Sequence, residues 1–356
     1  MSDAAAVAVR HLDRIREAVA DAGADALWVH PAIDFRYLTG LAPIAMERPT
    51  ALVIPARGDL RVVAPLMLAP ELERIEGATV AAWTDGDGPE DAIARVLDGL
   101  GRCLIAPDLP SGTAFALRAA RPGLELVLDP GILARLRERK GPDELDALRV
   151  AGREADDAMA WVAGADLDGR TERWLALELQ ARFLRRGFEP YAHYVVASGP
   201  NAALPHHETG DTPIAAGTPL LTDFGCIAGG YHSDMTRVHL PGDGGEVAEA
   251  YAVARAAHDA VIAGLEPGMP CHEADRLARA VIESAGHGER FVHRTGHGVG
   301  LEIHEQPYLR PGNPAPLEVG HVFSVEPGIY VPGRFGVRYE NLVHLAEDGP
   351  ELLNRP

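Results

Sequence analysis

The chain has 356 residues, of which 47% are hydrophobic and 24% charged, and its formal net charge is −19. This length is enough for two domains, since single hydrophobic cores stop growing near roughly 250–300 residues. The acidic balance argues against a nucleic-acid partner, because phosphate binding needs clustered lysine and arginine. No run of the chain approaches the roughly 18 apolar residues of a membrane span. We therefore expect neither a nucleic-acid nor a membrane partner.

The only lysine is Lys140, and glycine and proline follow it. A phosphate-binding P-loop needs Gly-Lys-Ser or Gly-Lys-Thr, so this class of protein is excluded. Three cysteines stand far apart and form no CxxC pair: Cys103, Cys226 and Cys271. This spacing predicts reduced thiols. Because the start, MSDAAAVAVR, also lacks the apolar core of a signal peptide, we expect a cytoplasmic protein.

The first part of the chain alternates helical and strand patterns. Apolar residues at helical spacing over 9–23 predict a helix that ends at Gly23. Short apolar runs predict buried strands at 26–29, 50–55, 60–65, 101–107 and 124–129. Helix–strand alternation of this kind predicts an α/β domain with a mixed sheet.

The pattern changes near Asp129-Pro130. A long amphipathic segment at 136–162 is interrupted by Gly141-Pro142, and Asp143 is placed to cap its helix. We place a boundary at 135–142, with domains at 1–135 and 136–356. The second domain has patterns for helices at 171–187, 246–264 and 273–285, and for strands at 192–198, 219–227, 231–239, 321–331 and 336–345.

Acidic residues and histidines concentrate in four segments of the second domain. These segments are LLTDFGCIAGGYHSDMTR with Asp223 and Asp234, HRTGHGVGLEIHEQP with His293, His297 and His304, FSVEPGIY with Glu326, and GVRYENLV with Glu340. Although His293 and His297 are four residues apart, Gly296 and Gly298 argue against the helix that a helical zinc motif needs.

The spacing of the acids suggests two hairpins. The midpoint of Asp223 and Asp234 falls between residues 228 and 229, next to a Gly-Gly turn, and the midpoint of Glu326 and Glu340 is Gly333. In simple hairpins each pair would be directly opposed, with Cβ atoms about 4.5–5.5 Å apart. Like charges so placed repel unless a cation lies between them or one of them is protonated.

A lone aspartate on a strand is more often a turn or edge residue than a metal ligand. Two opposed pairs beside a glycine-flanked histidine favour a metal site, because four buried carboxylates without a cation are costly. Four carboxylates and one imidazole form an oxygen-rich ligand set that favours Mn²⁺, with Co²⁺, Fe²⁺ and Zn²⁺ as alternatives. Two bridging carboxylates are typical of two-metal hydrolases, whose ions lie ~3.5–4 Å apart.

At these segments the sequence resembles the pita-bread metallopeptidases, which include Xaa-Pro dipeptidase (prolidase), aminopeptidase P, methionine aminopeptidase and creatinase. The matching motifs are DFG…SDMTR, GHGVG, HEQP, VEPG and RYEN, in that order. AIDFRYLTG at 32–40 resembles the N-terminal signature of the family, with Asp34 where asparagine is more usual. Methionine aminopeptidase lacks this domain and creatinase lacks the ligands. The resemblance therefore implies a prolidase-type N-terminal domain and an α+β pita-bread catalytic domain with an antiparallel sheet.

The resemblance also implies a dinuclear site. Asp223 would bind one ion in bidentate fashion, Asp234 and Glu340 would bridge both ions, and His297 and Glu326 would complete the ligand set. A water activated by the two cations would be the nucleophile, and Glu326 would accept its proton.

Further roles follow from the same resemblance. His206, rather than its neighbour His207, would touch the substrate and the oxyanion. His304 would hydrogen-bond the scissile carbonyl oxygen, and His293 would line the proline side of the cleft. Arg338 would orient a ligand carboxylate, and it is the only basic residue that we identify in the motifs as a partner for a substrate carboxylate.

The resemblance implies an exopeptidase that cleaves the amide bond between an N-terminal residue and proline, acting on small peptides as a homodimer. The short chain slightly favours an Xaa-Pro dipeptidase over an aminopeptidase P that acts on longer Xaa-Pro-Yaa peptides. A non-peptide amide hydrolase of the same fold is a further alternative. In another class, the chain could be a catalytically silent peptide- or protein-binding domain, which the intact ligand set disfavours.

Overall fold

The computed structural model describes residues 5–191 and 194–355. The chain divides into two compact units, Met1–Leu136 and Arg137–Pro356. We propose that these units are the two domains expected at 1–135 and 136–356. Within the described ranges, no helix is both long and apolar enough to cross a membrane.

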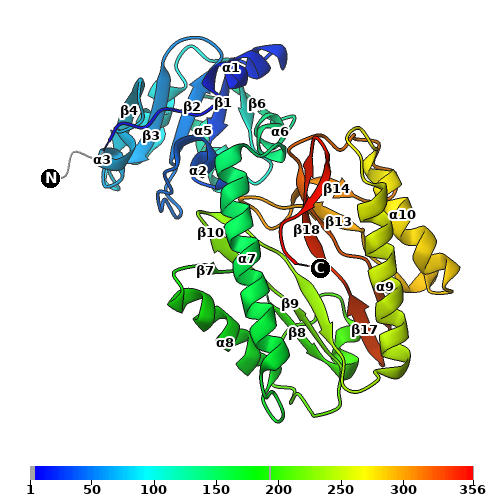
Figure 1. The fold of residues 1–356 in the computed structure, drawn as a ribbon. Coiled ribbons are helices and arrows are strands. Elements are labelled where there is room, and N and C mark those ends of the chain that lie inside the picture. Colours follow the sequence, from blue (N-terminus) through cyan, green and yellow to red (C-terminus); the bar gives the residue numbers. More distant parts are fainter. Residues whose placement is uncertain (1–4, 192–193, 356) are drawn as a thin grey trace. The chain divides into compact units, whose positions relative to one another are not determined.

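The first unit contains a six-stranded sheet (Figure 1). Its strands, in spatial order, are β4 (Ala78–Trp83), β3 (Leu60–Pro65), β2 (Ala51–Pro55), β1 (Ala26–Val29), β5 (Arg102–Ile105) and β6 (Glu125–Leu128). Strand β1 runs parallel to β5 and antiparallel to β2. The predicted mixed sheet is therefore confirmed, as are the five predicted strands, while β4 was missed by the pattern.

Helices accompany this sheet: α1 (Leu12–Asp21), α2 (Ile33–Thr39), α3 (Ala69–Leu72), α4 (Glu90–Val96), α5 (Ser111–Ala120) and α6 (Ile132–Glu138). The core of the unit consists of strand residues such as Trp28 and Val53 with helix residues such as Ile93 and Leu117. All four strand residues of β1 are buried, as its continuous apolar run predicts.

The second unit has four long helices: α7 (Pro142–Gly164), α8 (Glu172–Arg185), α9 (Gly245–Gly264) and α10 (Cys271–Ser284). The expected cap at Asp143 is wrong, because the helix begins earlier, at Pro142 with Gly141 as its N-cap. The Gly141 N–H donates to Glu144 Oε2 at 2.7 Å. Proline suits the first helical position, since its missing N–H would be unpaired there in any case.

Strands of the second unit form antiparallel pairs. Two three-stranded sheets comprise β7 (Glu189–Pro190), β10 (Cys226–Ala228) and β11 (Tyr231–His232), and β8 (Val195–Ser198), β9 (Leu220–Asp223) and β12 (Thr236–His239). A five-stranded sheet has the order β14 (Glu305–Leu309), β13 (Gly296–Gly298), β15 (Val322–Val325), β18 (Asn341–Ala346) and β19 (Gly349–Leu352). Strands β16 (Gly328–Val331) and β17 (Phe335–Arg338) pair separately. Of the strand predicted at 192–198, residues 192–193 lie outside the described residues, and the rest corresponds to β8.

The long strands expected at 219–227, 231–239, 321–331 and 336–345 are each interrupted. Three of these interruptions contain Asp234, Glu326 and Glu340. A break in regular pairing lets a side chain leave the strict alternation of a strand. Three of the five predicted ligands thus lie at irregular positions of these sheets, whereas Asp223 and His297 lie within strands.

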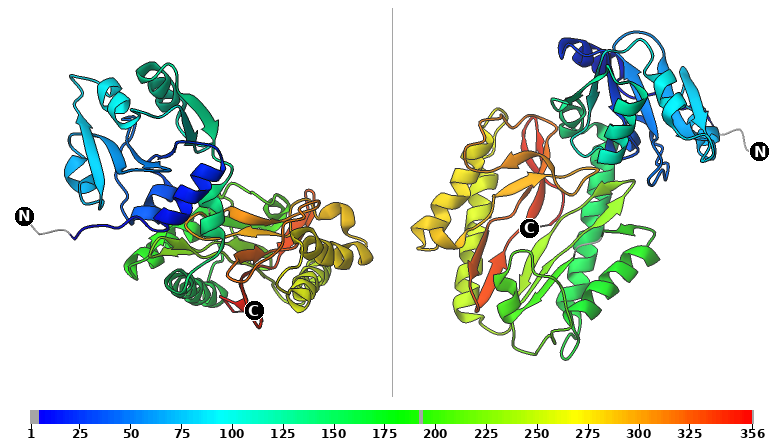
Figure 2. Two further views of the ribbon diagram at one scale, coloured as in Figure 1. Left: turned by 90° about the horizontal axis from the view of Figure 1, so that it is seen from above. Right: turned by 180° about the vertical axis from the view of Figure 1, so that it is seen from behind.

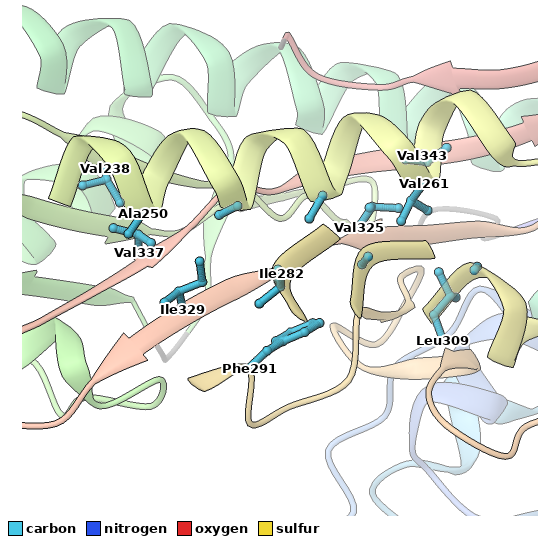
Figure 3. Close-up of a cluster of buried hydrophobic side chains, with 14 of the residues drawn as sticks. Val238, Ala250, Val261, Ile282, Phe291, Leu309, Val325, Ile329, Val337 and Val343 are labelled. Atoms are coloured by element: carbon cyan, nitrogen blue, oxygen red, sulfur yellow. The ribbon is translucent and has the colours of Figure 1, made fainter. Parts of the chain in front are cut away.

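Helix α7 packs on β10 and β11, α8 on β7 and β8, α9 on β16 and β17, and α10 on β14, so that the helices cover one side of the sheets (Figure 2). On α9, Ala250 and Val261 belong to one buried cluster with sheet residues such as Val325, Ile329 and Val337 (Figure 3). Burying one such valine or isoleucine contributes roughly 1.5–3 kcal/mol. This packed layer supports the strands that carry the predicted site.

Candidate metal centre

One cavity of about 390 Å³ in the second unit gathers the predicted site residues. Its lining consists of Pro205, His206, Asp223, Asp234, His293, Arg294, His297, His304, Glu326, Arg338 and Glu340. Every predicted metal, catalytic and substrate residue is therefore part of this lining.

The first carboxylate pair is not directly opposed, and that prediction is wrong. Ala228 pairs with Tyr231, and Asp223 pairs with Thr236. The turn consists of Gly229 and Gly230 alone, with φ values of 57° and 94°, as a two-residue type I′ hairpin requires. This turn shifts the register by two residues, so that Asp234 lies diagonal to Asp223 but on the same face.

The second pair has the predicted register. Val325 pairs with Asn341 on one side of it, and Gly328 pairs with Arg338 on the other. Both pairs are symmetric about Gly333, and this register sets Glu326 opposite Glu340. The Pro-Gly turn at 332–333 thus determined this part of the site from the sequence.

His297 lies in β13 between two glycines. A Cβ on Gly296 would clash with the carbonyl oxygen of Ser324, so only glycine lets the neighbouring strand approach this closely. The ring Nδ1 lies 3.2 Å from the Gly298 carbonyl oxygen, to which it donates. Its Nε2 faces the acids, 3.2 Å from Glu326 Oε1 and 3.7 Å from Asp234 Oδ2. This tautomer leaves Nε2 as the nitrogen that can bind a metal.

The electrostatics of the cavity suit a cation. Burial, and then the nearby carboxylates, raise the pKa of Asp234 and of Glu340 well above the usual range. Burial alone would also raise the pKa of Glu326, but the hydrogen bond with His297 and nearby positive charges hold that pKa well below its usual range. Ligand atoms of Asp234, His297 and Glu340 lie within 4.8 Å of one another. A raised pKa favours the protonated form of Asp234 and Glu340, and a divalent ion would take the place of those protons.

Arg338 is buried and fully engaged. Its guanidinium donates to Asp223 Oδ2, to Thr236 Oγ1 at 3.0 Å and to the Tyr330 hydroxyl at 2.6 Å. The Thr236 hydroxyl in turn donates to Glu340 Oε2. Arg338 is thus placed to orient carboxylates, because all three of its nitrogens bond groups of the site.

Tyr330 links Arg338 to His293. The tyrosine hydroxyl lies 2.9 Å from His293 Nε2, and His293 Nδ1 lies 2.7 Å from the Arg294 carbonyl oxygen. Because Nδ1 must donate to that carbonyl, Nε2 accepts from Tyr330. Burial lowers the pKa of His293 to about 4, so that the ring is neutral at pH 7.

Two further histidines are exposed at the cavity, His206 and His304. The rings of His304 and His297 meet edge to face, with centroids 4.1 Å apart. Burial, and then the charge of His297, lower the pKa of His304 to about 4. His207 lies outside the cavity lining, and its Nε2 is 2.8 Å from Glu172 Oε2.

Sequence reasoning overlooked Arg294, although it stands in the HRTGH motif. Its guanidinium stacks 4.5 Å over the Tyr308 ring and lies at the cavity. Within residues 5–191 and 194–355 it has no ion pair with a carboxylate. The signal that could have found it is its position between two site histidines.

A buried ion pair supports this segment. Asp275 accepts from Arg279 Nε at 2.6 Å and from the Thr295 hydroxyl at 2.9 Å, and Arg279 also donates to the His293 carbonyl oxygen at 2.6 Å. Sequence reasoning missed this pair too, because its members lie on α10, far from the motifs in the chain.

Comparisons with known proteins agree with this centre. Residues 146–347 match the family described as Metallopeptidase family M24, and residues 11–139 match the Creatinase/Prolidase N-terminal domain.

Relatives that match over nearly the full length of both chains are named as peptidases. A probable dipeptidase PepE from Mycobacterium tuberculosis is 38% identical over 98% of this chain and 95% of its own. An Xaa-Pro dipeptidase from Lactobacillus helveticus is 33% identical over 95% of each chain. The crystal structure of a recombinant prolidase from Thermococcus sibiricus has a TM-score of 0.90 at 32% identity, covering 97% of this chain and 96% of the other. The chain therefore belongs to metallopeptidase family M24, and it is a peptidase with the pita-bread fold.

Proposed function

We propose that this chain is an exopeptidase that uses two divalent ions to cleave the amide bond before a proline in second position, with dipeptides as preferred substrates. The observation that carries this proposal is the convergence of five ligand-type side chains on one cavity: Asp223, Asp234, His297, Glu326 and Glu340.

The donor set fits two divalent ions. Four carboxylates and one imidazole supply mainly hard oxygen ligands, which favour Mn²⁺, with Co²⁺, Fe²⁺ or Zn²⁺ as alternatives. Ligand atoms of Asp234, His297 and Glu340 lie within 4.8 Å of one another, and the resemblance to the family makes Asp234 and Glu340 the candidates to be shared by both ions. When bound, such a pair of ions lowers the pKa of water and polarises a carbonyl.

Protein side chains would accept the proton of the attacking water and stabilise the negative charge that develops on the scissile carbonyl oxygen. In the metal-free protein His297 and Arg338 hold the pKa of Glu326 well below its usual range, so its carboxylate is ionised and can accept a proton. His304 is neutral at pH 7 and carries a ring N–H that can donate to the scissile carbonyl oxygen. His206 faces the same cavity and would be a second contact for the substrate.

The preference for proline rests on the wall beside His293. Proline is a tertiary amide without an N–H, so a site for it needs shape and apolar contact in place of that hydrogen bond. His293 is held in place by Tyr330 and the Arg294 carbonyl oxygen, and it packs edge to face on Phe291. The names of the prolidase and Xaa-Pro dipeptidase relatives support this assignment.

The preference for dipeptides rests on Arg294. The free carboxylate of an Xaa-Pro dipeptide lies on the proline itself and needs a cationic partner within the cavity. Arg338 is committed to Asp223 and Tyr330. Arg294 instead offers its guanidinium to the cavity, and stacking on Tyr308 limits its freedom. We therefore assign the carboxylate contact to Arg294 rather than to Arg338.

We further propose a homodimer in a reducing, cytoplasmic compartment. The dimer rests on resemblance to the family, and the compartment on three cysteines that are buried and free.

A substrate panel tests the function. The purified protein with added Mn²⁺ should cleave Xaa-Pro faster than Xaa-Pro-Yaa, and both faster than Xaa-Ala. Equal cleavage of Xaa-Ala would refute the proline assignment, and a tenfold preference for the tripeptide would make the enzyme an aminopeptidase P. Cleavage of non-peptide amides alone would reassign the substrate class, and no turnover with any of them would favour a silent binding domain.

A further inference from the structure

The two carboxylates assigned as bridges lie on different sheets. Asp234 lies two residues before β12 of a three-stranded sheet, whereas Glu340 immediately precedes β18 of the five-stranded sheet. Strand pairing therefore does not by itself set the distance between them. Other contacts must hold the two segments in register.

One such contact is the side chain of Asn354, which follows β19 and is only 3% exposed. Its Oδ1 accepts from the Leu342 N–H and from Asn341 Nδ2, each at 2.9 Å. Its Nδ2 donates to the Asp234 carbonyl oxygen at 3.1 Å. A single amide side chain thus bonds the backbone of one bridging residue and the two residues that follow the other.

Neighbouring groups hold Asn354 in this position. Asn341 Nδ2 also donates to the carbonyl oxygens of Asn354 and Arg355, at 3.2 and 3.0 Å. The Leu353 N–H donates to the Leu342 carbonyl oxygen at 2.9 Å. Because Asn341, Leu342, Leu353 and Asn354 are buried, a donor or acceptor left there without its partner would be costly, and the arrangement is well defined.

A second contact joins the same segments from the other side. Arg237 Nη1 donates to the carbonyl oxygens of both Thr236 and Glu340, and the Glu340 N–H donates to the Thr236 carbonyl oxygen at 3.3 Å. Arg237 and Asn354 together replace the strand pairing that is absent between the two sheets.

We propose that Asn354 is a positioning residue for the metal centre, which sets the separation of Asp234 and Glu340 so that both can touch both ions. This inference rests on the proposed dinuclear site. Metal ligands must be held within about 0.5 Å of their productive positions, and loss of a group that orients ligands typically lowers metal affinity by about 10- to 100-fold.

The experiment measures metal binding without any peptide, so it does not depend on which amide the enzyme cleaves. Mn²⁺ is titrated by calorimetry into metal-free wild-type protein and into Asn354→Ala and Asn354→Ser variants. The matched control is Arg149→Ala, which removes the ion pair to Glu351 on β19 at 2.9 Å but leaves Asn354 in place. Thermal unfolding of each metal-free protein reports its stability separately.

We expect the Asn354 variants to bind Mn²⁺ at least tenfold more weakly than wild type, or with fewer ions per chain. Arg149→Ala should unfold at a lower temperature yet bind Mn²⁺ with unchanged affinity and stoichiometry. If the alanine variant does not fold, the smaller change to serine, which keeps a polar group, supplies the measurement. Wild-type affinity in a folded Asn354 variant, or an equal loss in Arg149→Ala, would overturn the proposal.

Discussion

Replacing Arg294 by methionine should selectively impair the cleavage of dipeptides. Methionine keeps the length and apolar contact of the side chain over Tyr308 but removes the guanidinium. The contact that would be lost is a hydrogen bond between two charged groups, which is worth about 1.5–3 kcal/mol. At about 1.36 kcal/mol per tenfold change in rate, kcat/KM for Xaa-Pro should fall by about 10- to 150-fold.

The separate values of KM and kcat should show whether this contact contributes to substrate binding or to the chemical step. The proline carboxylate does not change its charge during hydrolysis, so the contact stabilises substrate and transition state about equally. KM should therefore rise while kcat stays nearly constant.

Substrate changes complete the test. In Xaa-Pro amide and in Xaa-Pro-Yaa the carboxylate is absent from the proline, so Arg294→Met should leave their kcat/KM within about threefold of wild type. Arg290→Met is the matched control, because Arg290 lies near His287 and outside the cavity lining. An equal loss on dipeptide and dipeptide amide would refute the assignment of Arg294 to the carboxylate.

Four further outcomes follow. Chelation should abolish turnover and Mn²⁺ or Co²⁺ should restore it, whereas an Asp234→Asn, Glu340→Gln double variant should regain no activity with added metal; activity of that variant after chelation would contradict the metal assignment. His304→Ala should lower kcat by about 10²- to 10³-fold, the cost of one oxyanion donor, with unchanged metal content by elemental analysis; loss of metal would make it a ligand. Burial lowers the pKa of His321 to about 4, below about 6.5 for an unfolded chain, so its contribution is complete above pH 6.5 and is lost as pH falls towards 4. Urea unfolding of metal-free protein at pH 7 and pH 4.5 should show a drop that His321→Gln reduces, by up to about 3 kcal/mol; identical drops would contradict this. Sedimentation should show a homodimer at assay concentration, and an active monomer would refute that proposal.

Much of the centre could be predicted from the sequence, because its ligands lie in short motifs whose spacing is local. The register of Glu326 and Glu340 followed from a turn centred on Gly333, seven residues from each of them. The N-terminal strands were equally accessible, since β1 is buried on both faces and reads as an unbroken apolar run.

In the first hairpin, residue spacing did not predict the correct strand register. Its two acids were placed by their midpoint, but the Gly229-Gly230 turn takes only two residues and moves Asp223 opposite Thr236. A change of turn length alters every pairing in a hairpin, and the turn conformation depends on dihedral angles that the residue spacing does not contain.

By itself, the sequence predicted the candidate ligands and their order and determined the kind of fold, because each of these is carried by neighbouring residues. The tertiary structure alone showed how the two arginines at the cavity are engaged. The sequence analysis considered Arg338 and overlooked Arg294. In the structure both line the cavity, but Arg338 bonds Asp223, Thr236 and Tyr330, whereas Arg294 stacks on the Tyr308 ring. The sequence did not indicate a role for Asn354 either, since its partner Asp234 lies 120 positions away in the chain. Contacts between distant segments depend on how the sheets pack, and residue spacing carries no record of that packing.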